Sequence, residues 1–256
     1  MRQILGLLLV CTVFVFCNTS CNRIDYTFAA IMAGVGQMCG GMASDTESFN
    51  SAPPSGTQSS GMSIMSINKS NAPTLGSDGW ISNSKAFLGR TLSWRYQFLD
   101  ENSVAVTSDT VLGVWNEAQV RAKRMHFIET FVGPHGTFNA DLWFTRDNVG
   151  QKGGTVSGSC SGSNDEGGSF SATFNSLRGK GDGSGTLVGG TITASFSSVR
   201  GKACSITMTF KSDGSADGKI TSGSYSADIH LNPDKTGYYT DSEGKHEIGT
   251  PVRAAS

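Results

Sequence analysis

Charged residues are scarce in this chain of 256 residues, in which Asp, Glu, Lys and Arg together make up 16% and the formal net charge is −1. A protein that binds nucleic acid through its phosphates needs a local excess of Lys and Arg. A nearly neutral chain with few charges offers no bulk attraction of that kind. We therefore do not expect nucleic acid as a partner.

The chain also lacks the short motifs of common catalytic, cofactor and metal sites. It contains no P-loop and no dinucleotide fingerprint, and its histidines and cysteines do not have the spacing of metal ligands. The run Gly-Ser-Cys-Ser-Gly at 158–162 imitates a nucleophile elbow, but turn and strand residues follow it, whereas the elbow requires a helix. The oxygen-rich run at 213–218 lacks the closing Glu of a calcium loop and is interpreted as a hairpin turn. We expect no enzymatic activity, no cofactor and no metal.

After the first 20 residues no apolar run is long enough to span a membrane as a helix. Residues 4–16 are almost wholly apolar and follow Arg2. A helix of this length would cover roughly 20 Å, less than the roughly 30 Å of a bilayer core. A short apolar run behind a positive start is typical of a secretory signal, so residues 1–20 are predicted to be a signal peptide.

The end of this signal resembles the lipobox of bacterial lipoproteins, in the looser pattern of spirochaetes and Bacteroidetes. Thr19, Ser20 and Cys21 match its last three positions. The resemblance implies acylation of Cys21 with palmitate or a similar chain, and a lipid-anchored place in the cell envelope, at the outer membrane. The alternative is a cleaved, secreted protein with Cys21 in a disulfide.

Residues 21–79 have the composition of a tether. From residue 44 onward Ser, Gly, Asn, Thr and Pro dominate and large apolar residues are sparse. Such a segment buries too little surface to offset its ordering entropy. We therefore expect a lipidated N-terminus and flexible linker over 21–79, followed by one domain over 80–256.

Apolar and polar residues alternate with period two through most of this domain. Leu92, Trp94, Tyr96 and Phe98 alternate with Ser93, Arg95 and Gln97, and at least four later runs behave alike. Gly- and Asp-rich turns separate these runs. The pattern predicts a mainly β fold, an antiparallel meander that forms a barrel or a sandwich. One short helix is expected over 116–124.

Two segments, 167–180 and 189–202, are close copies with a period of 22 residues. Duplication of a hairpin for packing alone explains them without any ligand. The functional alternative is a repeated basic rim at the strand ends that binds an acidic partner or a glycan. Its candidate residues are Arg178, Lys180, Arg200 and Lys202.

Cysteines of the domain lie in strand-like segments. Export makes a disulfide permissible, and Cys160 and Cys204 are the predicted pair.

Aromatic residues at outward positions are the remaining clue to function. Trp143 falls on the polar phase of its strand, and Trp80, Trp115, Tyr238 and Tyr239 lie near strand or loop ends. We expect an envelope-anchored interaction protein with an adhesive, structural or binding role, and a protein or a glycan at the envelope surface as the candidate partner. The alternative is a lipocalin-like barrel that carries a small apolar ligand, with the large aromatics lining its cavity.

Overall fold

The computed structural model describes residues 73–87, 89–149, 153–165, 167–180, 187–197, 203–234 and 236–248. Within these residues the chain forms thirteen strands and one helix. Their bounds are β1 Thr74–Leu75, β2 Ile81–Phe87, β3 Arg90–Leu99, α3 Val111–Arg121, β4 Arg124–Gly133, β5 Gly136–Arg146, β6 Gly154–Asn164, β7 Ser169–Gly179, β8 Leu187–Ser197, β9 Ala203–Phe210, β10 Ala216–Ser222, β11 Tyr225–Leu231, β12 Gly237–Asp241 and β13 Gly244–Ile248.

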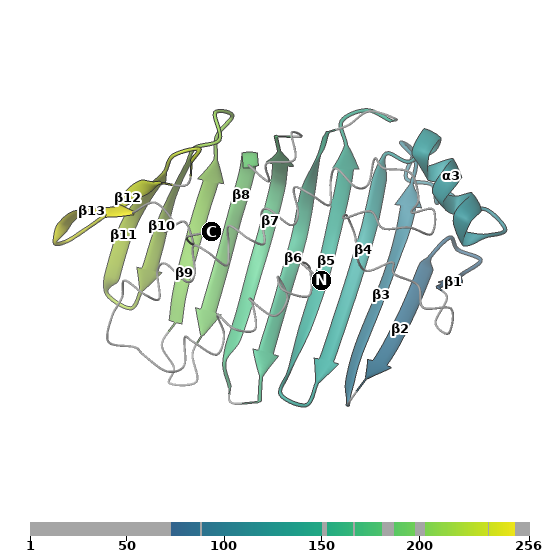
Figure 1. Cartoon of the computed structure of the whole chain (residues 1–256), viewed down its shortest axis with the longest axis horizontal. Coiled ribbons are helices and arrows are strands. Elements are labelled where there is room, and N and C mark those ends of the chain that lie inside the picture. The colour runs from purple at the N-terminus through teal and green to yellow at the C-terminus, as the bar shows by residue number, and fades with distance from the viewer. Residues whose placement is uncertain are drawn as a thin grey trace, which may run out of the picture.

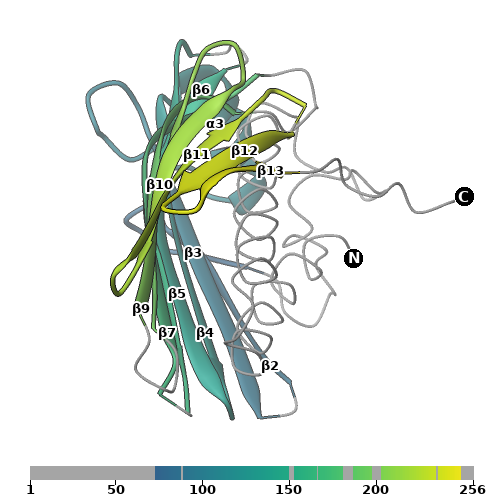
Figure 2. The same ribbon diagram turned by 90° about the vertical axis from the view of Figure 1, so that its left-hand side faces the viewer.

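All these strands belong to one antiparallel sheet, ordered along the sheet as they are along the chain (Figure 1). The predicted meander is confirmed. The sheet is strongly curved (Figure 2), and its order runs from β1 at one end to β13 at the other. In the part of the chain that the structure describes, no pairing joins these two end strands, so the ladder is open.

The two faces of the sheet differ as the alternation predicts. In β5, Ala140, Leu142 and Phe144 are buried, while Asn139 and Asp141 are exposed. Buried residues of the neighbouring strands continue the same face, which forms the core. The opposite side, on which Asn139 and Asp141 lie, is called the outer face below.

The internal repeat forms the hairpin of β7 and β8. Antiparallel pairing sets Ala172 opposite Ala194, its equivalent in the other copy, and Phe170 opposite Phe196. A repeat of 22 residues thus becomes a local two-fold arrangement around the two buried alanines. Small side chains at its centre and large ones on either side fill the buried face evenly, which supports the packing interpretation of the duplication.

The helix α3 packs its aromatic residue against β3. Trp115 is buried and its indole Nε1 donates to the hydroxyl of Tyr96 at 2.9 Å, and its ring lies edge-on to Phe98 with centroids 4.9 Å apart. Burial raises the pKa of the Tyr96 hydroxyl. The helix begins at Val111, before the predicted start at residue 116, because Thr110 caps it by accepting from the amide of Gly113 at 3.0 Å.

A buried arginine closes the other end of α3. The guanidinium of Arg146, at the end of β5, donates through Nη1 to the carbonyls of Ala118, Gln119 and Ala122, at 3.0, 3.3 and 3.1 Å. These carbonyls belong to the last helical turn and to the C-cap residue Ala122, where the peptide dipoles leave partial negative charge. One side chain therefore ties the helix to the sheet and satisfies its C-terminus.

Candidate functional site

Five side chains on the outer face form a continuous stack of rings and guanidinium groups, which we call the outer stack. The Cζ atom of Arg95 lies 4.6 Å from the centroid of Trp80, and the Trp80 and His126 centroids are 5.3 Å apart. The imidazole of His126 stacks on Trp143 at 3.9 Å with an interplanar angle of 15°. Arg124 follows, with Cζ 5.6 Å from the Trp143 ring. Two cations thus flank three aromatic rings.

Strand register explains how these residues meet. His126 on β4 lies directly opposite Trp143 on β5, and Arg95 lies on the neighbouring strand β3. Trp80 enters from the turn before β2, which Gln97 holds against the outer face by donating to the carbonyl of Asp78 at 2.7 Å. Neighbouring positions on one face of a sheet are close enough for ring contacts.

The charges of the outer stack are unequally paired. His126 Nε2 lies 2.7 Å from a carboxylate oxygen of Asp141, whose side chain is 56% exposed. Arg124 donates to the hydroxyl of Ser103. Among the described residues, no carboxylate lies within ion-pair distance of Arg95 or Arg124. Both guanidinium groups therefore keep the capacity to bind an added anion.

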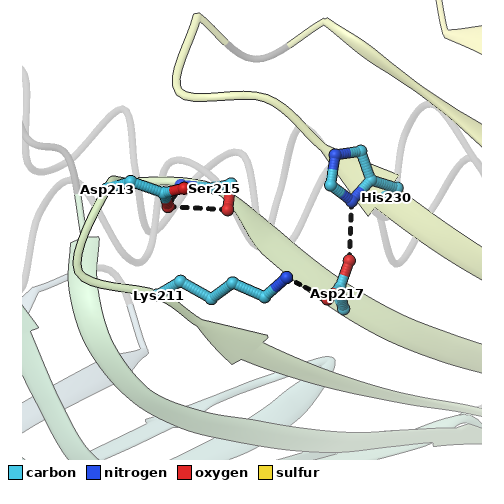
Figure 3. A network of polar contacts seen from close by, with 5 residues as sticks. All are labelled: Lys211, Asp213, Ser215, Asp217 and His230. Carbon is cyan, nitrogen blue, oxygen red and sulfur yellow. Dashed lines mark hydrogen bonds and ion pairs between the residues drawn. The ribbon is translucent and has the colours of Figure 1, made fainter.

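A second polar cluster, drawn in Figure 3, has Asp217 and His230 at outer-face positions of β10 and β11, near the other end of the sheet. We call it the distal network. Asp217 on β10 accepts from Lys211 Nζ at 2.5 Å and contacts His230 Nδ1 on β11 at 2.6 Å. The hydrogen bond from Lys211, with a smaller contribution from His230, lowers the pKa of Asp217. The His230 ring lies 5.1 Å from Tyr238, and Lys245 Nζ lies 3.9 Å from the centroid of that phenol.

The turn beside the distal network is the predicted β-hairpin. Asp213 accepts from the amide of Ser215 at 2.8 Å and from its hydroxyl at 2.7 Å (Figure 3). These bonds lower the pKa of Asp213. The oxygen-rich run at 213–218 therefore holds the connection from β9 to β10 in place, and within the described residues no group of three or more acidic, His or Cys side chains has the geometry of a metal site.

Only part of the predicted basic rim lies within the described residues. Arg178 is engaged by both carboxylate oxygens of Asp147, in the connection after β5, and Lys123 donates to the carbonyl of Asp147. The bond from Arg178 lowers the pKa of Asp147. Lys180 is exposed just after β7, while Arg200 and Lys202 lie outside the described residues. Arg178 thus joins two strand ends, and a binding role for the rim stays a prediction.

The predicted disulfide is wrong, since no bond joins Cys160 to Cys204. Cys160 lies on β6 and Cys204 on β9, with β7 and β8 between them. Three strand spacings amount to about 14 Å, whereas bridged cysteines have Cα atoms at most about 7 Å apart. Both residues occupy strands, as expected, but the order of the strands keeps them apart.

Trp143 and Trp80 of the outer stack are among the aromatic residues expected at outward positions, but the sequence does not predict Arg95, Arg124 and His126 as part of a site. Trp115, considered for interaction, is 6% exposed and belongs to the core. Period-two alternation places Arg95 and His126 on the outer face, but only the pairing of β3, β4 and β5 shows that they adjoin Trp143.

The predicted lipidation site, Cys21, lies outside the described residues. In the described part of the chain no helix has the length and apolar character needed to cross a membrane. No protein-family model, no curated protein and no solved structure matches this chain.

Proposed function

We propose that the protein is a lipoprotein of the cell envelope, anchored through Cys21, whose β domain binds a glycan on the outer face of its sheet. The observation that carries the proposal is the outer stack. Trp80, His126 and Trp143 lie on the side of the sheet where the strand alternation places polar and exposed residues. Large aromatic side chains at such positions are a common feature of recognition surfaces.

The chemistry of the outer stack suits a sugar. The C–H groups of a pyranose ring carry partial positive charge and pack against the negative face of an indole. Sugar hydroxyls need donors and acceptors beside that surface, which Asp141, His126 and the two arginines supply. An anchored domain with such a face would hold the envelope to a polysaccharide layer or to a neighbouring cell.

The core geometry favours this reading over a lipocalin-like carrier. Trp94, Tyr96 and Phe98, which a carrier would use as a cavity lining, instead contact one another and Trp115. A tightly packed aromatic cluster leaves these rings engaged with the protein itself. We therefore propose the glycan-binding role alone.

Binding of the detergent-solubilised full-length protein to immobilised polysaccharides tests the proposal. The probes are polygalacturonate, alginate, hyaluronate and neutral dextran. We expect at least one to bind, and Trp143→Ala to weaken that binding at least tenfold while Trp143→Phe, which keeps a ring, weakens it less. Ser169→Ala, an exposed change on the same face of β7, is the matched control and should bind as the parent does. Failure of every probe, or equal binding by Trp143→Ala, would refute the proposal.

A further inference from the structure

The outer stack and the distal network lie on one continuous row of cross-strand neighbours. Each residue of this row stands opposite the next in the strand ladder, apart from the register shift between β6 and β7, where the amide of Ser176 donates to the hydroxyl of Ser157 at 2.9 Å. In order across the sheet, the cross-strand row is His126, Trp143, Ser157, Asn175, Thr191, Thr209, Asp217, His230, Tyr238 and Glu247.

The composition of the row changes in a regular way along its length. Both ends pair a histidine with an aspartate and set an aromatic ring beside a cation. The middle carries only hydroxyl and amide side chains that are half-buried or exposed: Ser157, Asn175, Thr191 and Thr209. The cross-strand row thus has small hydrogen-bonding side chains in its middle and larger aromatic rings at its two ends. A chain rich in hydroxyls can form hydrogen bonds along it.

The length of the cross-strand row indicates that its ligand is a polymer. Trp143 on β5 and Asp217 on β10 are separated by five strand spacings, or about 24 Å along the sheet. One or two sugar rings cannot reach both ends. A linear polysaccharide that crosses the strands can, and contacts at both ends then act together, with the second end binding at a high effective concentration.

The unpaired guanidinium groups indicate the charge of that polymer. Arg95 lies over Trp80 and Arg124 lies beside Trp143, and among the described residues neither is paired with a carboxylate. A sugar ring that packs on either indole would bring an attached carboxylate within reach of the adjacent guanidinium, which suits bidentate binding. At the far end Lys211 and Lys245 add cations, although Asp217 and Glu247 already contact them.

We infer that the cross-strand row binds one extended, carboxylate-bearing polysaccharide chain, which lies across the strands from the outer stack to the distal network. This inference rests on the proposed glycan-binding function and deepens it. It assigns a role to the distal network, and it predicts that binding depends on chain length, on charge and on ionic strength.

Titration of the full-length protein with ligands of matched chemistry tests this inference. The ligands are polygalacturonate, its disaccharide, and methyl-esterified polygalacturonate, which has the same backbone without the charges; alginate and hyaluronate replace the set if either binds better. We expect the polymer to bind about 100-fold more tightly than the disaccharide. The esterified polymer should bind at least tenfold more weakly than the charged one.

Two variants distinguish the contributions that the two ends of the row make to binding. Tyr238→Ala combined with Lys245→Ala should weaken polymer binding at least tenfold and leave disaccharide binding unchanged. Trp143→Ala should weaken both, Ser169→Ala neither, and the unfolding midpoint of each variant verifies its fold. Full polymer affinity in the Tyr238/Lys245 variant would show that the polymer does not bind along the whole cross-strand row, and would leave the proposed function standing. Equal affinity for the esterified polymer would show that the protein does not recognise the carboxylates of the ligand. Failure of all probes would refute the inference together with the proposed function.

Discussion

At the scale of single residues, Cys160 shows how a strand position determines chemistry. Its side chain points into the core beside Ala140 and Ala172, and the residue is 5% exposed. Removal of the thiolate from water raises the pKa of this thiol to about 12. Because the thiolate is the reactive form, burial makes Cys160 inert, whereas Cys204 is only partly buried.

The burial of Cys160 predicts which cysteine reacts with an alkylating agent and how the stability of the protein depends on pH. In the native protein at pH 8, iodoacetamide should modify Cys204 and spare Cys160, as peptide mapping by mass spectrometry would show. Between the unfolded pKa of about 8.5 and the folded value, the unfolded chain loses a proton that the folded chain keeps, so stability falls as pH rises, by about 2 kcal/mol at pH 10.

Urea unfolding of Cys160→Ala and of Cys204→Ala isolates this effect. The alkaline loss of stability should shrink in Cys160→Ala relative to the parent and persist in Cys204→Ala. A rapidly labelled Cys160, or the same pH dependence in both variants, would contradict the buried thiol.

At the scale of elements, α3 depends on a residue far from it in the chain. Arg146 binds two carbonyls of the C-terminal turn of the helix and the carbonyl of its C-cap residue, Ala122. This turn carries only Arg121 as a basic residue of its own. Burial of the guanidinium lowers the pKa of Arg146, but arginine stays charged in proteins. The cost of burying this charge is offset by hydrogen bonds to the end of the helix dipole.

Arg146→Met should therefore destabilise the protein by about 2–4 kcal/mol, since three carbonyls lose a charged donor. The matched control is Arg121→Met on the same helix, whose pair with Glu117 is exposed and should contribute less than about 1 kcal/mol. Urea denaturation followed by Trp fluorescence measures both, because Trp115 lies in α3. Equal stability of the two variants would show that the carbonyls find other partners.

At the scale of the whole molecule, the two faces of the open meander differ, and our proposals assign binding to only one of them. Its buried face forms the core, and its outer face carries the cross-strand row over most of the sheet. A face of this breadth becomes useful for holding a polymer when the protein itself is held, because a tether keeps the sheet close to its ligand. The proposed lipid at Cys21 would provide that attachment.

The intact mass of protein purified from the membrane fraction tests the anchor. We expect the mass of residues 21–256 plus a diacylglyceryl group and an acyl chain. Cys21→Ser should move the protein to the soluble fraction while leaving polysaccharide binding unchanged. An unmodified mass beginning near residue 21 would establish a secreted protein and would leave the binding proposals to be judged separately.

The sequence by itself determined the strands, the hairpins and the faces. Alternation with period two and turn residues are local properties, so β5 and the β7–β8 repeat could be predicted from their own residues. The outward position of Trp143 followed for the same reason. The predicted start of α3 is late because the helix is capped by Thr110 and not by the Asn at position 116.

Only the tertiary structure decided which of these residues meet. Strand order separates Cys160 from Cys204, and it brings Arg178 to Asp147 and His126 to Trp143. It also aligns the outer stack and the distal network on one row across strands that are far apart in sequence. The physical reason is that side-chain phase depends on neighbouring residues, whereas contact depends on the register of every strand in between.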